Sequence, residues 1–164
     1  MKIIIDGDAC PSISKIEDLA KEYAIEVNIF VDIHHVIKSD YSKVIVVDSG
    51  FQSVDMYVVN NSKINDIVVT QDYGVASMCL GRGCKVINPR GTLYTDDNMD
   101  VLLEQRYIAQ KFRKAGGRLK GHKKRTKEDE ERLIKNLRAL IEYIIKNWRL
   151  KKYNYFLKPF LFVV

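Results

Sequence analysis

The chain has 164 residues, of which 46% are hydrophobic and 29% are charged, a composition typical of one globular domain. It contains no apolar stretch of the roughly 20 residues that a membrane-spanning helix needs, and its N-terminus does not have the pattern of a signal peptide. Three cysteines without metal-ligand or Cys-x-x-Cys spacing argue against a disulfide scaffold and favour a cytoplasmic location.

The formal net charge of +6 combines two regions of opposite sign. Residues 1–100 carry 9 basic and 15 acidic side chains, a balance of −6, whereas residues 101–164 carry 18 and 6, a balance of +12. A basic C-terminal third attached to an acidic body predicts a polyanionic partner for that third.

Short β-rich apolar runs alternate with helical patterns along the first part of the chain. Helical spacing of apolar residues is found over residues 13–23, 54–60 and 73–80. Strands alternating with helices imply a parallel sheet, and continuously apolar strands imply that both its faces are covered. The sequence therefore predicts an α/β fold: a three-layer, mostly parallel five-stranded sheet with helices on both faces. The five strands are expected at residues 3–5, 27–31, 44–47, 67–70 and 85–87.

The character of the chain changes near Met99. We expect an α/β body over residues 1–98 and a C-terminal helical region over residues 99–148, packed on the body as one domain. A basic, apolar-poor stretch at residues 116–127 is predicted to be a loop, and a helix is expected from Thr126. The tail, residues 149–164, mixes lysines with aromatic residues and fits neither period, so packing on the body, strand addition, membrane contact and disorder all stay open.

Acidic residues follow several of the predicted strands. Asp6 and Asp8 come after the first strand, and Asp32, Asp48 and Asp72 end later ones. The carboxyl ends of parallel strands lie at one edge of a sheet, where ligands of such folds bind. Several carboxylates without a cation repel one another, and carboxylate oxygens suit Mg²⁺ or Mn²⁺. The sequence therefore predicts a divalent-metal site at this edge.

Each acid also has a structural alternative. Asp72 precedes a helix as an N-cap, and Asp55 falls in a first helical turn, where its charge suits the helix dipole. Asp66 precedes its strand, so we expect it at the opposite edge in a structural role. Cys10 is interpreted as a small buried residue, and the histidine pair at residues 34–35 as solvated.

Basic residues dominate the segment between Glu104 and Glu128, where no acid occurs. Such a cluster suits the phosphate backbone of a nucleic acid, although a solvated basic loop is the alternative. The residues predicted to bind nucleic acid are Arg90, Arg106, Arg113, Lys114, Arg118, Lys120, Lys123, Lys124 and Arg125.

The sequence Asp-Gly-Asp-Ala-Cys-Pro at positions 6–11 resembles the D-x-D-A-C-P opening of the YaiI/YqxD family of uncharacterised bacterial proteins. The order and spacing of further short motifs extend the resemblance over about residues 1–145. Those motifs are Gly50-Phe51, Asp55, residues 66–72, Gly83, residues 88–91, Tyr94-Thr95, Arg106 and Gly116-Gly117.

This family is related to PIN-like nuclease domains, which hold divalent metal between acids and cut RNA or DNA. The resemblance therefore implies a PIN-like fold and a hydrolase with Asp6, Asp55 and Asp72 as catalytic metal ligands and Asp8 as a flanking ligand. The implied cofactor is Mg²⁺ or Mn²⁺, and the implied substrate is RNA, with DNA as the second choice. Gly7 stands where the family usually has Ala, residues 121–122 read Gly-His where it usually has Gly-Pro, and the tail has no recognised counterpart.

Two other functions remain open from the residues alone. The Asp6-x-Asp8 pair resembles the nucleophile pair of haloacid-dehalogenase-type phosphatases, although Ala-Cys-Pro follows where that family has a nearby Thr. A non-catalytic, nucleic-acid-binding or receiver-like module is the second alternative. A binding module predicts that Asp6→Asn keeps function, whereas charge reversal at Lys123 and Lys124 abolishes it.

Overall fold

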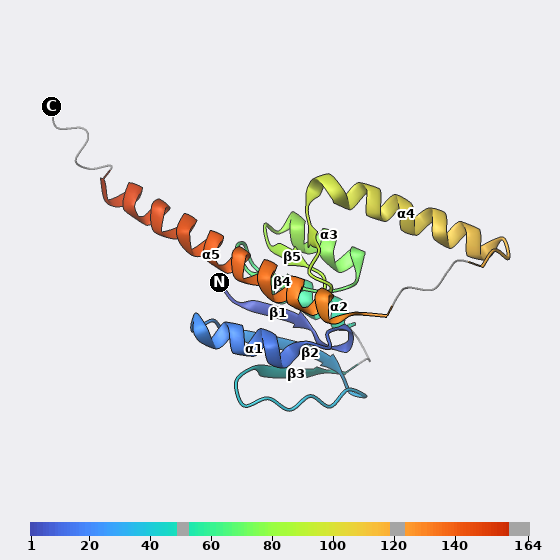
Figure 1. The fold of residues 1–164 in the computed structure, drawn as a ribbon, viewed down its shortest axis with the longest axis horizontal. Coiled ribbons are helices and arrows are strands. Elements are labelled where there is room, and N and C mark those ends of the chain that lie inside the picture. Colours follow the sequence, from blue (N-terminus) through green and yellow to red (C-terminus); the bar gives the residue numbers. More distant parts are fainter. Residues whose placement is uncertain (49–52, 119–123, 158–164) are drawn as a thin grey trace.

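The computed structural model describes residues 1–48, 53–118 and 124–157. Its centre is a six-stranded sheet in the order β3-β2-β1-β4-β5-β6, which places the first strand in the interior (Figure 1). The strands are β1 (Ile3–Asp6), β2 (Val27–Asp32), β3 (Lys43–Val47), β4 (Ile67–Val69), β5 (Lys85–Ile87) and β6 (Leu93–Tyr94).

Strands β1 to β5 are all parallel, as the alternating pattern predicts. Ile3 of β1 is in register with Val27 of β2 and with Ile67 of β4, and β3 and β5 extend the sheet on either side. The sixth strand, which the sequence does not signal, pairs antiparallel with β5 because a tight turn returns the chain beside it. In that turn, the Asn88 amide donates to the Thr92 carbonyl at 2.9 Å.

Helices cover both faces of the sheet, so the predicted three-layer α/β class is confirmed. Helices α1 (Ile13–Glu22) and α5 (Lys127–Leu157) lie on one face, in front of the sheet in Figure 1, and α2 (Val54–Asn61) and α3 (Tyr73–Gly81) cover the other. The side chains of β1 alternate between two apolar clusters, since Ile5 packs with Leu137 of α5 and Ile4 with Val58 of α2. Burial on both sides explains the continuously apolar strands.

Helix α4 (Asp96–Lys114) follows β6 and extends away from the sheet (Figure 1). Thr95 caps its start, because the Thr95 hydroxyl accepts from the Asn98 amide and the Asn98 side chain accepts from the Thr95 amide. Met99 is the buried residue of this helix, and Leu102 packs beside it. Most of the α4 surface therefore faces solvent.

The turn at residues 88–91 fastens α5 to the sheet. Gly91 has a positive φ of 83°, and a Cβ there would lie 2.5 Å from the backbone nitrogen of Leu133 in α5. The Gly91 carbonyl accepts from the Asn136 amide at 2.7 Å, and the Pro89 carbonyl accepts from the Arg125 guanidinium at 2.9 Å. Only glycine fits this close approach, so the turn and α5 hold each other in place.

Parts of the predicted organisation fall outside the described residues. They include Gly50-Phe51, the centre of the basic loop at residues 119–123, and the tail beyond residue 157. Helix α4 begins at Asp96 and α5 continues to Leu157, whereas the division into a body and a helical region stays a prediction. Among the described helices, none combines the length and the apolar character needed to cross a bilayer.

Candidate metal centre

Four aspartates gather at the carboxyl edge of the sheet, and we call them the acidic cluster: Asp6, Asp8, Asp55 and Asp72. Asp6 is the last residue of β1, and Asp8 follows in a short 3₁₀ helix, η1 (Gly7–Ala9). Asp72 is the N-cap of α3, and Asp55 lies in the first turn of α2. Parallel strand order thus brings residues from three separate parts of the sequence to one edge.

Asp6 is the most buried member, with 7% of its surface exposed. Burial is the largest cause that raises the pKa of the Asp6 carboxyl from 3.8 to about 6. A hydrogen bond from Thr70 lowers the pKa, and repulsion from Asp55, Asp8 and Asp72 adds to the rise, all within that net value. The Thr70 hydroxyl donates that bond at 2.9 Å. A carboxylate in this position is costly unless it is paired or used.

Asp72 divides its two oxygens between two tasks. Its Oδ1 accepts from the amides of Gly74 at 2.6 Å and Val75 at 3.1 Å, which confirms the structural role as an N-cap. Its Oδ2 lies 3.4 Å from the Arg106 guanidinium of α4. The cap fixes the side chain, and Oδ2 remains turned toward α4 and the open edge.

Asp55 is a second member of the acidic cluster whose carboxyl has a raised pKa. Partial burial raises the pKa of its carboxyl, and like-charge repulsion from Asp72 and Asp8 raises it further. Asp55 and Asp6 therefore both experience the same two neighbours, Asp8 and Asp72. The cluster offers carboxylate oxygens alone, which suit a hard divalent cation such as Mg²⁺ or Mn²⁺. Among the described residues, however, no three of these four acids bring ligand atoms within 4.8 Å of one another.

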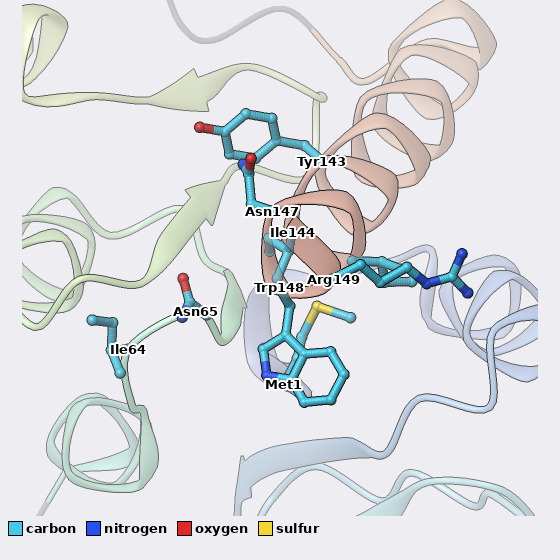
Figure 2. A pocket seen from close by; sticks show the side chains of 9 residues that line it. Met1, Ile64, Asn65, Tyr143, Ile144, Asn147, Trp148 and Arg149 are labelled. Carbon is cyan, nitrogen blue, oxygen red and sulfur yellow. The ribbon is translucent and has the colours of Figure 1, made fainter. Parts of the chain in front are cut away.

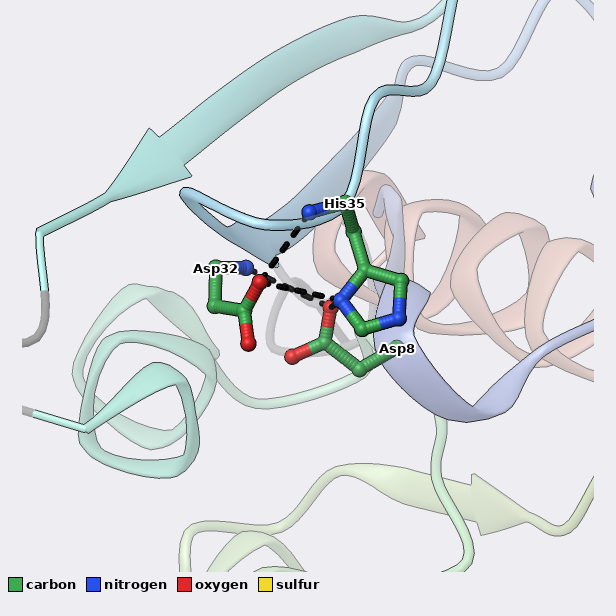
Figure 3. A group of neighbouring side chains, drawn as sticks. All are labelled: Asp8, Asp32 and His35. Carbon is green, nitrogen blue, oxygen red and sulfur yellow. Dashed lines mark hydrogen bonds and ion pairs between the residues drawn. The ribbon is translucent and has the colours of Figure 1, made fainter.

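A second group of ligand-bearing side chains lies beside the acidic cluster: Asp8, Asp32 and His35 (Figure 3). One potential ligand atom from each residue lies within 4.8 Å of the other two, and the described residues were searched for such groups. His35 Nδ1 lies 2.9 Å from Asp32 Oδ1 and 3.1 Å from Asp8 Oδ1. The Asp32 carboxylate also accepts from the His35 amide, so the turn after β2 closes onto η1.

The prediction of solvated histidines at 34–35 is thus only half right. His35 is half exposed, but its ring is held between two acids. The sequence signal that could have indicated this contact is a histidine three residues after Asp32, the acid that ends a strand. That spacing closes a turn through the Asp32 side chain, which accepts from the His34 amide at 2.7 Å.

Replacing Asp32 by Asn should lower the pKa of His35. The hydrogen bond that the His35 ring donates to Asp32 is the main cause that raises this pKa above 6.5, and the charges of Asp8 and Asp32 add to it. We expect the imidazole NMR titration to move toward lower pH in Asp32→Asn and to stay unchanged in Asp18→Asn, an exposed acid of α1. An unaltered His35 titration in Asp32→Asn would show that the contact does not persist in solution.

The predicted nucleic-acid-binding residues occupy different positions. Arg106 and Arg113 line a 390 Å³ hollow between α3 and α4 that borders Asp72. Arg90 and Arg125 instead form ion pairs with Asp129 and Glu130 at the start of α5. Exposed positions are found for Lys114, Arg118 and Lys124, whereas Lys120 and Lys123 lie outside the described residues.

Two further interpretations from the sequence are confirmed. Cys10 is buried, and burial raises the pKa of its thiol to about 11, so the thiol is protonated and inert at neutral pH. Asp66 lies at the opposite edge and is used structurally. Its carboxylate accepts from the amides of Lys2 at 2.9 Å and Lys63 at 3.0 Å.

A cavity of 510 Å³ lies away from these acids, between the C-terminal half of α5 and the amino edge of the sheet (Figure 2). Met1, Ile64, Tyr143 and Trp148 are among its lining residues. Met1 and Ile64 precede β1 and β4, so this cavity lies at the edge opposite to the acidic cluster. No acid is found among the described residues that line it, and it lies apart from the acidic cluster.

Comparison with known proteins identifies the family. Residues 4–143 match the model of the uncharacterised YaiI/YqxD family, and the chain belongs to that family. A UPF0178 protein of Clostridium perfringens (strain ATCC 13124) is 56% identical over 144 residues, covering 88% of this chain and 97% of its own. One of Clostridium kluyveri (strain ATCC 8527) is 57% identical over 141 residues, covering 86% and 93%.

A solved structure is also found by comparison, at low similarity. It is the crystal structure of a mutant of Rae1 (YacP) from Bacillus subtilis, with a TM-score of 0.44 and 17% sequence identity. The match covers 89% of this chain and 91% of that one.

Proposed function

We propose that the protein is a divalent-metal-dependent nuclease that hydrolyses phosphodiester bonds of RNA, with DNA as the second choice. One observation carries the proposal: Asp6, Asp8, Asp55 and Asp72, from separate parts of the chain, meet at the carboxyl edge of a parallel sheet, where Asp6 is buried. That arrangement raises the free energy of the cation-free site and is relieved by a bound cation. The family is uncharacterised, so the proposal rests on this site.

We assign to the residues the roles that the resemblance to PIN-like nucleases implies. Asp6, Asp55 and Asp72 hold Mg²⁺ or Mn²⁺, and Asp8 flanks them. When bound, such a cation polarises a phosphoryl oxygen and makes hydroxide available near neutral pH. Thr70 orients Asp6 through its hydroxyl, which also accepts from the Asp72 amide at 3.0 Å, so one side chain aligns two acids.

A cleavage assay with the whole chain tests the proposal. We expect labelled RNA of mixed sequence to be cut in the presence of Mg²⁺ or Mn²⁺ and to remain intact in EDTA. Crystals soaked in Mn²⁺ should show anomalous density among Asp6, Asp55 and Asp72. A pure protein that cuts neither RNA nor DNA with either metal would refute the proposed function.

A further inference from the structure

The hollow between α3 and α4, which we call the α3–α4 groove, borders the acidic cluster directly. It has a volume of 390 Å³, in the range that holds a small ligand. Asp72 belongs both to the acidic cluster and to the groove lining. Whatever lies in the groove therefore touches the predicted metal centre.

One face of α4 supplies most of the groove. Leu102, Gln105, Arg106, Ala109 and Arg113 follow the helical spacing of three and four residues, so they share this face. Leu102 and Ala109 are half-buried and form an apolar floor, whereas the two arginines are exposed. Arg113 lies two turns beyond Arg106, about 10 Å further along the helix axis. Ala109 lies between the two arginines and Leu102 lies one turn before Arg106, so apolar and cationic side chains alternate along this face. Such an alternation suits a chain that alternates flat rings with phosphates.

Arg106 already has two partners at the groove. Its guanidinium lies 3.4 Å from Asp72 Oδ2 and 5.7 Å from the centre of the Tyr73 ring. The Tyr73 ring is fixed in turn by an edge-on contact with Tyr94 at 5.7 Å. A guanidinium is planar and carries five donors, so one ion pair and one ring contact leave donors for a phosphate and a plane for a base.

We propose that the α3–α4 groove seats an unpaired nucleotide of a single-stranded nucleic acid next to the acidic cluster, with Arg106 and Arg113 contacting its phosphates. The identity of the reaction at that nucleotide rests on the proposed function, whereas binding itself does not. In a duplex the bases are paired and stacked inside, so the apolar floor would gain nothing from it. Unpaired bases stack on aromatic side chains and on arginine planes.

Fluorescence anisotropy in EDTA tests the groove without cleavage. The probe is a labelled ten-nucleotide RNA of mixed sequence, alone or annealed to its complement. We expect the single strand to bind about tenfold more tightly than the duplex, and Arg106→Gln to weaken single-strand binding about tenfold and lower the salt slope by about one. Arg106→Lys should fall between, because it keeps the charge but loses the planar fork.

The matched control is Lys135→Gln, which removes an exposed positive charge from α5 on the opposite face of the sheet. It should leave binding unchanged. Equal binding of single strand and duplex, or unaltered binding by Arg106→Gln, would overturn the groove assignment. If the wild type cleaves RNA and Arg106→Gln binds it normally, the groove assignment is refuted and the proposed nuclease function stands. If Arg106→Gln weakens binding but the wild type cleaves no nucleic acid, the groove assignment stands and the nuclease function is refuted.

Discussion

Asp6→Asn should reduce metal-dependent cleavage by about a thousandfold, the equivalent of roughly 4 kcal/mol of lost transition-state stabilisation. Asn keeps the size of the side chain and an oxygen that accepts from Thr70, whose hydroxyl lies 2.9 Å from Asp6. The substitution therefore removes the negative charge and little else. Initial rates on labelled RNA in Mn²⁺, with the fold checked by circular dichroism, measure the effect.

Two further variants separate charge from structure. Asn is as good an N-cap as Asp, so Asp72→Asn should keep the bonds from Gly74 and Val75 while it loses activity to a similar extent. Asp18→Asn removes an exposed acid of α1 that pairs with Lys21, and it should cleave at the wild-type rate. Retained activity in both Asp6→Asn and Asp72→Asn would contradict a metal centre at this edge.

The sheet was predictable because its signal is local and strong. Each buried strand is a run of β-branched residues followed by a polar residue, and the observed bounds differ from the predicted ones by a residue at most. The two-residue β6 carries no such signal, since it depends on the turn at residues 88–91 placing the chain beside β5. Pairing of that kind is a property of the folded molecule.

The position of the acids at one edge of the sheet was predictable, whereas their role as metal ligands stays a prediction. Strand order puts Asp6 and Asp72 at one edge, and this follows from the alternation of strands and helices. The sequence does not reveal that one carboxylate oxygen of Asp72 accepts the N-cap hydrogen bonds of α3. It also does not reveal that Arg106 of α4, 34 residues later, contacts the other oxygen. Nor does it reveal that His35 closes onto Asp8, because that contact depends on the shape of the turn after β2.

The basic residues illustrate the same limit. Charge alone placed Arg90 and Arg125 with the nucleic-acid-binding set. In the structure both pair with acids at the start of α5, where they fasten the turn at residues 88–91. Composition gives the sign of a surface, whereas the partner of each cation depends on tertiary packing. Their contact with nucleic acid remains a prediction, and Arg106 and Arg113 are better placed for it.

The buried charge of Asp6 should also set the pH dependence of stability. The pKa of the Asp6 carboxyl is about 6 in the folded protein and 3.8, its ordinary value, in the unfolded chain. Between these two pH values the folded state therefore binds more protons than the unfolded state. Stability should therefore fall as the pH rises from about 4 to about 6, and remain lowered above that. The difference corresponds to roughly 3 kcal/mol at neutral pH.

Asp6→Asn removes this cost, so it should raise the free energy of unfolding at pH 8 by up to about 3 kcal/mol, and the gain should vanish near pH 4. Urea titrations of both proteins at the two pH values measure it. Mn²⁺ should stabilise the wild type at pH 8 and leave Asp6→Asn nearly unchanged, because only the charged site gains from the cation. A variant that is less stable than the wild type at pH 8 would show that Asp6 is satisfied without a metal.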